Sequence, residues 1–432
     1  MSRRLALVTL LILLAGAFLA LGFWLRRGQR AGGPLPQEAY VWQRSWGPEV
    51  RKAVEGSEGL AGLVALAAEV DLSTRPPLMT EVEIDKAALR STGKPVGLAI
   101  RIGRFSRPEP NRLADDPEAV RLLAGLARQI AARARAQGLE PREIQLDYDC
   151  PESRLDEYPL LVKAVKEAVR PLPVTITALP VWLRRRRDFA RLAAAADGFV
   201  LQVHSLAVPR RFDAAFLLCD PAAAKQAVEA AARFHSPFQV ALPTYGYVVA
   251  FDQAGKVIGL SAEGPLLSWP RSAAVRVARS DPKAMARLVR EWTADRPAEL
   301  AGILWYRLPN TADRLNWPWP ALRAVMNGRT PRRELRADSR SPEPDLVEID
   351  LVNTGEEDAP WPTPVAMDWN GAPLLAADGL AGYRLTRGGE RGILLRRENT
   401  AWDRLLRPGD RRQVAWLRFA GQARVQTVLP PP

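Results

Sequence analysis

Apolar and polar residues alternate along most of the chain in a pattern that predicts short strands separated by helices. Eight runs are rich in Val, Ile, Leu and aromatic residues, as strands are. They cover residues 40–46, 62–70, 96–102, 144–149, 174–179, 198–204, 237–242 and 302–308. Between several of these runs, apolar residues recur at three- and four-residue spacing, which predicts amphipathic helices. This order of strands and helices predicts a parallel sheet.

Three of the predicted helices carry a clear start signal. The pairs Asp116-Pro117, Asp220-Pro221 and Asp281-Pro282 each place an N-cap aspartate before a proline at the first helical position. Eight strand–helix units in roughly 290 residues suit a (β/α)8 barrel, which typically takes ~250 residues. A doubly wound open sheet is the alternative, but no G-x-G-x-x-G motif follows the first strand. We therefore expect an α/β fold with a TIM-like barrel.

The pattern changes after the seventh predicted strand. Residues 247–264 hold two alternating runs around a polar turn, which predicts a hairpin. From about residue 331, short alternating runs are separated by turns and show little helical periodicity, which predicts a small β-sandwich. We expect three parts: residues 1–32 as a membrane or signal segment with a linker, 33–330 as the barrel, and 331–432 as the sandwich.

Residues 5–25 carry no charge and lie between Arg3-Arg4 and Arg26. A secretory signal has a shorter apolar region, whereas ~18 or more apolar residues can span a bilayer. We interpret this segment as a retained single-pass anchor in a bacterial inner membrane, with the main domains in the periplasm. A cleaved signal and a secreted protein are the alternative.

The composition limits the kinds of partner and cofactor. The net charge is +13, but the arginines are spread along the chain with acids between them, as in proteins from GC-rich genomes. No nucleic-acid motif accompanies them, so we expect no nucleic-acid partner. Only two cysteines and two histidines occur, which excludes common zinc clusters, and we predict no metal or cofactor. Cys150 and Cys219 could form a disulfide outside the cytoplasm.

The stretch "IQLDYDCPE" ends the fourth predicted strand with two aspartates. Side chains alternate along a strand, so Gln145, Asp147 and Asp149 share one face, with the two carboxylates ~6.5–7 Å apart at Cβ. In a TIM-like barrel the polar face points into the barrel mouth, the end at which the strands finish and where active sites lie. We predict acid–base or binding roles for Asp147 and Asp149. Structural pairing with Arg101 or Arg307 is the alternative interpretation.

Other strand ends place polar and aromatic residues at the same end of the barrel. Aromatic faces stack on sugar rings and polar groups fix the hydroxyls, so this set predicts a carbohydrate ligand. The predicted substrate-binding residues are Trp42, Arg101, Gln145, Gln202, His204, Tyr245, Trp305 and Arg307.

The motifs "WQRSW", "IQLDYDCPESRLDEY", "VLQVHSL", "VALPTYGY" and "WYRLPNTADRLNW" together resemble a bacterial family known as domain of unknown function 3142 (DUF3142). The resemblance covers residues 38–430 and implies a TIM-like, extracytoplasmic barrel. The D-x-D end of the fourth strand also resembles chitinase-like glycosidase barrels, which have D-x-D-x-E. Here Pro151 occupies the glutamate position and Glu152 comes one residue late, so Asp149 or Glu263 would have to supply the proton.

Two hypotheses for function follow. The first is an anchored glycoside-hydrolase-like enzyme that acts on an envelope polysaccharide, with Asp147, Asp149 and Glu263 as its carboxyl groups. The second is a non-catalytic barrel that binds envelope glycan or serves as a scaffold, which the missing D-x-D-x-E glutamate favours. Loss of turnover rather than of binding in a carboxylate variant separates them.

Overall fold

A computed structural model of the protein describes residues 29–430 except 75–76, 104–115, 205–208, 210, 215–216, 263–268, 271, 390 and 398–404. The predicted anchor, residues 5–25, and Glu263 lie outside the described residues. Within the described part of the chain, no helix is both long and apolar enough to cross a membrane.

Eight parallel strands of the described chain close into a barrel. Their order is β2-β3-β5-β6-β7-β8-β9-β14, and β14 pairs with β2 to complete the ring. The strands are β2 (Gln37–Val41), β3 (Gly62–Asp71), β5 (Val96–Ile102), β6 (Pro141–Tyr148), β7 (Val174–Ala178), β8 (Phe199–Gln202), β9 (Phe238–Pro243) and β14 (Leu300–Tyr306). The predicted TIM-like barrel is confirmed, because sequential parallel strands form a closed ring.

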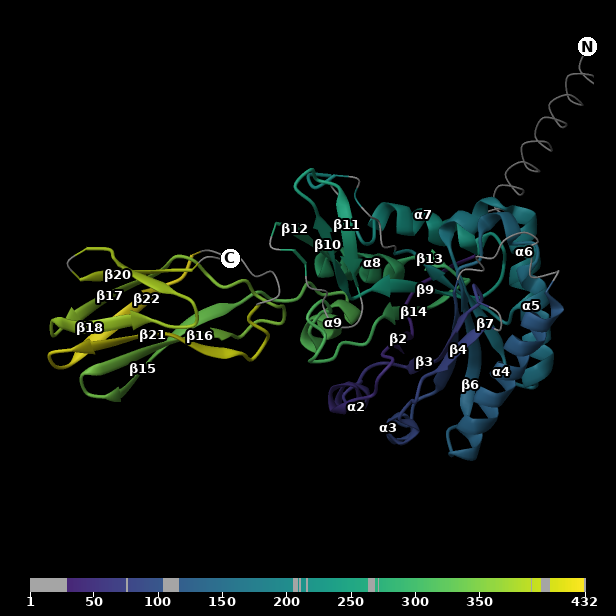
Figure 1. Ribbon diagram of the computed structural model, residues 1–432, viewed down its shortest axis with the longest axis horizontal. Helices are drawn as coiled ribbons and strands as arrows, with labels where there is room; N and C mark the ends of the chain where they lie inside the picture. The colour runs from purple at the N-terminus through teal and green to yellow at the C-terminus, as the bar shows by residue number, and fades with distance from the viewer. Residues whose placement is uncertain are drawn as a thin grey trace, which may run out of the picture.

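A helix follows each barrel strand, and the helices surround the barrel (Figure 1). They are α2 (Pro48–Glu55), α3 (Lys86–Ser91), α4 (Pro117–Ala136), α5 (Tyr158–Val169), α6 (Arg186–Ala195), α7 (Pro221–Ala232), α8 (Pro282–Ala294) and α9 (Trp319–Met326). The predicted caps are confirmed: Asp116, Asp220 and Asp281 each accept a hydrogen bond from a backbone N–H of the first turn.

Short elements accompany the barrel. Strand β4 (Leu78–Glu81) pairs antiparallel with β3, and β1 (Arg30–Ala31) pairs with β13 (Arg296–Pro297). Two 3-10 helices follow β6 and β7: η2 (Glu152–Arg154) and η3 (Pro180–Arg184).

The predicted hairpin after β9 is part of a three-stranded antiparallel sheet. Strands β10 (Gly246–Phe251) and β11 (Val257–Ser261) form the hairpin, and β12 (Ala274–Arg279) pairs with the other edge of β10. Sequence reasoning missed β12, whose apolar residues are interrupted by arginines. One face of β10 packs in a small core of its own, with Tyr247, Val249 and Phe251 buried.

Charged residues fill the interior of the barrel at the amino ends of the strands. Arg142 donates to Glu38 Oε1 and to Glu143 Oε1, each at 2.5 Å, and Thr175 Oγ1 donates to Glu143 Oε2 at 2.9 Å. Glycine gives these side chains space, since a Cβ atom at Gly97 would lie 2.8 Å from Glu143 Oε1. A paired polar layer therefore closes this end of the barrel.

The C-terminal part forms two four-stranded antiparallel sheets that share one core, including Ile349, Val365, Leu395 and Leu417. In Figure 1 it lies at one end of the molecule, beside α9 and the β10–β12 sheet. One sheet comprises β15 (Leu335–Glu343), β16 (Leu346–Asn353), β21 (Arg411–Phe419) and β18 (Leu374–Gly379). The other comprises β19 (Arg384–Arg387), β20 (Gly392–Arg396), β17 (Val365–Gly371) and β22 (Ala423–Val428).

Candidate functional site at the barrel mouth

Three neighbouring strands place alternating charges side by side at the mouth. Arg101 of β5 pairs in register with Glu69 of β3 on one side and with Asp147 of β6 on the other. An Arg101 guanidinium nitrogen lies 3.7 Å from Glu69 Oε1, and Arg44, in the loop after β2, binds the same carboxylate at 2.6 and 2.8 Å. The charge of Arg101 also acts on Asp147.

Two strands beyond β6 complete the surroundings of Asp147. Thr177 Oγ1 of β7 donates to Asp147 Oδ1 at 2.7 Å, and Gln202 Nε2 of β8 donates to the same oxygen at 3.2 Å. Since both donors use Oδ1, the described residues place no hydrogen-bond donor on Oδ2. The carboxyl group is thus oriented from one side and keeps one oxygen for another partner.

The acidity of Asp147 is shifted toward neutral pH. The pKa of its carboxyl group is raised to about 6, chiefly by burial and also by the nearby Asp149 carboxylate. The hydrogen bonds from Thr177 and Gln202 and the charge of Arg101 lower the pKa but do not cancel the effect of burial. A carboxyl group with this pKa can hold or release a proton near neutral pH.

Asp149 differs from Asp147 in its surroundings. It lies immediately after Tyr148, the last residue of β6, and is exposed to solvent. The two carboxyl groups of the predicted pair therefore experience different environments, one enclosed by the barrel and one open to water. In enzymes with two active-site carboxyl groups, such a difference in environment lets one group act as the acid and the other as the base.

Tyr306, the last residue of β14, lies at the centre of an aromatic cluster. Its ring centroid lies 5.7 Å from Tyr40, 5.5 Å from Trp42, 5.3 Å from His204 and 5.3 Å from Tyr245. His204 stacks nearly parallel to Tyr306, and the other three rings meet it at steep angles. The cluster joins residues of β2 and β14 with residues of the loops that follow β2, β8 and β9.

Two ring nitrogens of this cluster, Trp42 Nε1 and His204 Nε2, are buried and have no hydrogen-bond partner among the residues that the structure describes. Burial lowers the pKa of His204 to about 4, so the ring is neutral at pH 7. Its Nδ1 lies 3.4 Å from the Tyr245 hydroxyl. A buried donor without an acceptor costs ~1–3 kcal/mol, and a ligand oxygen at this place would remove that cost.

Gln145 lies deeper in the barrel than its neighbours in the predicted set. It is fully buried, accepts a hydrogen bond from the Tyr40 hydroxyl at 2.5 Å and donates to Thr175 Oγ1 at 3.4 Å. It holds Tyr40, whose ring in turn packs against Tyr306 and Trp42. Its position supports the aromatic cluster from below.

The predicted placement of Trp305 in the mouth is wrong. Trp305 is fully buried on the outer face of the barrel, where its Nε1 donates to Gln37 Oε1 at 2.9 Å and its ring lies 6.2 Å from Trp317. The predicted inward face of β14 was wrong by one residue. Gly302 faces the barrel interior beside Gln239, and since side chains alternate along a strand, Tyr306 also faces inward and Trp305 faces outward.

Arg307 follows β14 and is committed to a buried ion pair. Its Nε and Nη2 lie 2.9 and 2.5 Å from Asp313 Oδ2, and the two side chains are only 7% and 13% exposed. Thr244 and Asn316 also donate to its backbone carbonyl. Arg307 therefore fixes the loop between β14 and α9, and within the described residues it forms no ion pair with Asp147 or Asp149.

The predicted disulfide is not formed. Cys150 and Cys219 are both free and buried, and burial raises the pKa of each thiol to about 12. Cys150 Sγ lies 3.5 Å from the carbonyl oxygen of Pro151. Within the described residues, no group of three or more His, Cys, Asp and Glu side chains could hold a metal ion.

Sequence reasoning missed Glu69, Tyr40 and Tyr306. Tyr306 could have been found from the parity of β14, because glycine at residue 302 is the small residue expected where the interior is crowded. Glu69 lies near the end of the second predicted strand, 62–70, where its charge interrupts an apolar run.

Sequence comparison identifies the family. The model of a domain of unknown function (DUF3142) matches residues 93–311, half of the chain, from just before β5 to the loop after β14. The chain belongs to this family. The DUF3142 resemblance predicted from the sequence motifs is thus confirmed. A second domain of unknown function (DUF8456) matches residues 336–420, within the C-terminal sheets.

Solved structures similar to this DUF3142 protein include two kinds of enzyme. The spore cortex-lytic enzyme SleL of Bacillus megaterium QM B1551 is 12% identical, with 69% of this chain and 75% of that chain covered and a TM-score of 0.48. A chitinase of Chromobacterium violaceum ATCC 12472 is 14% identical, with 68% and 98% covered and a TM-score of 0.46. At these TM-scores the likeness carries no argument about activity. No curated protein matches the chain in sequence.

Proposed function

We propose that this protein is a glycoside-hydrolase-like barrel that acts on an envelope polysaccharide at its mouth. The observation that carries the proposal is Asp147, a partly buried carboxyl group with a pKa of about 6 that, among the described residues, has hydrogen-bond donors on one oxygen only. Residues 5–25 would anchor the chain in the inner membrane and leave the barrel in the periplasm, where such a polymer is found.

The proposed reaction is hydrolysis of a glycosidic bond. Asp147, protonated below pH 6, gives its proton to the leaving oxygen as the carbon–oxygen bond breaks. Asp149 is the exposed carboxylate beside it and stabilises the positive charge that develops on the sugar ring. Water supplies the hydroxyl group of the new reducing end, and its remaining proton restores the acid.

The aromatic cluster would bind the sugar. Tyr306 offers a partly exposed ring, and pyranose rings stack their apolar faces on aromatic side chains. Trp42 Nε1 and His204 Nε2 are buried nitrogens without a partner in the described part of the chain, and sugar oxygens would accept from those that carry hydrogen. Arg101 and Gln202 approach the same carboxyl group and would orient the hydroxyls next to the bond that breaks.

One observation favours a glycan-binding protein without turnover as the second candidate. The strand does not extend to a third inward-facing carboxylate, because β6 ends at Tyr148 and Glu152 begins the 3-10 helix η2 after Pro151. A barrel of this kind would hold the polymer through the same side chains without cleaving it.

An assay of cleavage and binding separates the two candidates. Wild type and Asp149→Asn are incubated with a panel of bacterial and plant polysaccharides, and both new reducing ends and retained polymer are measured. We expect wild type to release reducing ends and Asp149→Asn to bind the same polymer with at most a small loss in affinity while releasing few or none. Binding without cleavage by both proteins would establish the second candidate, and no binding by either would contradict both.

A further inference from the structure

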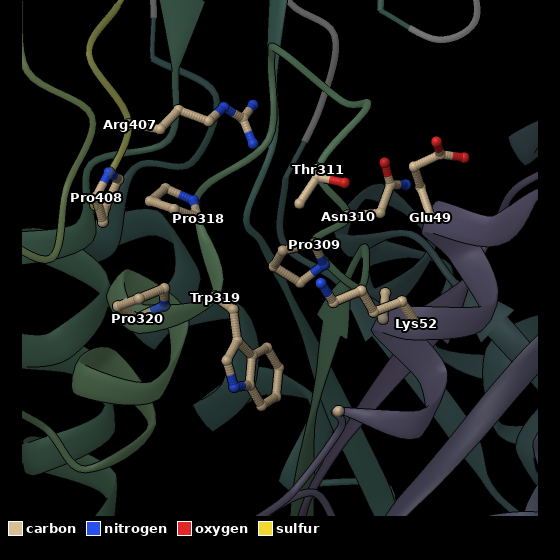
Figure 2. A pocket seen from close by; sticks show the side chains of 12 residues that line it. Glu49, Lys52, Pro309, Asn310, Thr311, Pro318, Trp319, Pro320, Arg407 and Pro408 are labelled. Carbon is tan, nitrogen blue, oxygen red and sulfur yellow. The ribbon is translucent and has the colours of Figure 1, made fainter. Parts of the chain in front are cut away.

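A second pocket lies on the outside of the barrel, between the barrel and the C-terminal sheets. Its volume is about 290 Å³. Figure 2 shows its walls: Glu49 and Lys52 on α2, residues 309–311 of the loop after β14, Pro318 to Pro320 at the start of α9, and Arg407 with Pro408 from the C-terminal part. Ligand pockets begin at about this size, which suits one small cyclic molecule.

The surface of the pocket is part apolar and part polar. Trp319 and four prolines supply flat or rigid apolar surface, as Figure 2 shows for Pro309, Pro318, Pro320 and Pro408. Lys52 and Glu49 bring one positive and one negative charge from adjacent turns of α2. Within the described residues neither of these two side chains has an ion-pair partner, so both remain able to bind a ligand.

The walls are held in place before any ligand arrives. Asn310 Oδ1 accepts from the backbone N–H groups of Ala312 and Asp313, each at 2.9 Å, which fixes the loop after β14. Arg407 donates to the backbone carbonyl of Asp313 at 2.5 Å and so attaches the C-terminal wall to this loop. A preformed pocket loses little conformational entropy when it binds a ligand.

We propose that this pocket binds one pyranose unit of a glycan, as an accessory subsite separate from the barrel mouth. A pyranose has an apolar face for Trp319 and the prolines, and hydroxyl groups that both donate to Glu49 and accept from Lys52. An acyl chain or other apolar ligand would remove water from both charges and give no hydrogen bond in return. The proposal extends the proposed function from one sugar site to two.

Ligand-observed saturation-transfer NMR tests the pocket directly. The probes are the methyl glycosides of glucose, galactose, N-acetylglucosamine and glucuronic acid, added to the full chain in a detergent without a sugar head group. We expect at least one of the four to bind wild type. Lys52→Ala should weaken that binding by about tenfold or more, because it removes a charged hydrogen-bond donor.

Two further variants show whether a loss of binding comes from the pocket itself. Trp319 and Ala53 both pack against the barrel core, so the variant used must keep the wild-type unfolding midpoint. Ala53→Phe adds a ring from α2 into the pocket and should abolish binding. Lys163→Ala on the exposed surface of α5 is the matched control for Lys52→Ala and should leave the affinity unchanged.

The outcomes separate this proposal from the proposed function. Binding that survives Tyr306→Ala, in the barrel mouth, but is lost in Ala53→Phe places a sugar in the second pocket, whether or not the mouth cleaves polysaccharide. Binding that is lost in Tyr306→Ala and unchanged in Ala53→Phe assigns the sugar to the mouth and overturns the second site. The absence of binding by all four glycosides also overturns it.

Discussion

At the scale of single residues, Asp147 shows how burial and hydrogen bonding oppose each other in setting acidity. Burial raises its pKa, while Thr177, Gln202 and Arg101 favour the charged form, and the result is a value of about 6. Sequence parity predicted that Asp147 faces the mouth. It did not predict the two donors on Oδ1, because they depend on the stagger between β6, β7 and β8.

Replacing Asp147 should stabilise the protein at neutral pH. The folded-state pKa of about 6 exceeds the ordinary 3.8, so the folded protein binds this proton more tightly than the unfolded chain does. The stability that the protonated carboxyl group gives to the fold is therefore lost as the pH rises from 3.8 through 6. Asp147→Asn keeps an oxygen for both donors and removes the partly buried charge. We expect its free energy of unfolding in urea to exceed that of wild type by about 1–3 kcal/mol at pH 7 and by little at pH 4.

Measuring the stability difference between Asp147→Asn and wild type at both pH 4 and pH 7 provides the control for this prediction. A difference between wild type and Asp147→Asn that is the same at pH 4 and pH 7 would mean that Asp147 titrates with an ordinary pKa. The acid role would then lose its physical basis.

At the scale of elements, strands were predicted well and their faces less well. All eight barrel strands overlap their predicted ranges, because each is a run of apolar residues bounded by polar ones. The prediction placed the first strand at 40–46, but β2 ends at Val41, so Trp42 belongs to the following loop. Aromatic residues occur on both faces of β14, and apolarity alone did not show that Tyr306, rather than Trp305, faces inward.

The loop after β14 depends on the buried pair of Arg307 and Asp313. Asp313→Asn leaves the guanidinium buried without its charge partner, and we expect it to lower the free energy of unfolding by about 3–5 kcal/mol. Asp213→Asn makes the same change in the exposed pair with Arg211 and should cost less than about 1 kcal/mol. Chemical denaturation of both variants and wild type gives the two values.

Equal losses in the two variants, or a loss below about 1 kcal/mol in Asp313→Asn, would contradict this role for the pair. The same result would weaken the argument that Arg307 is structural, and it would return Arg307 to the group of candidate sugar ligands.

At the scale of the whole molecule, strand and helix periodicity was enough to predict a barrel followed by a β-sheet region. The site was only partly predictable. Asp147, Gln202, Trp42, His204 and Tyr245 lie at the mouth as expected, because the carboxyl ends of all barrel strands meet there. The second pocket could not be foreseen, since α2, α9 and Arg407 are far apart in sequence and meet only when the C-terminal part lies against the barrel.

The pH dependence of polysaccharide cleavage by wild type and Asp147→Asn tests the acid role of Asp147 most directly. With Asp147 as the proton donor, the wild-type rate should fall about tenfold for each pH unit above 6, and the variant should be slower by about 100-fold or more at pH 5. A variant as fast as wild type, a rate that rises between pH 6 and pH 8, or no cleavage at any pH would contradict it.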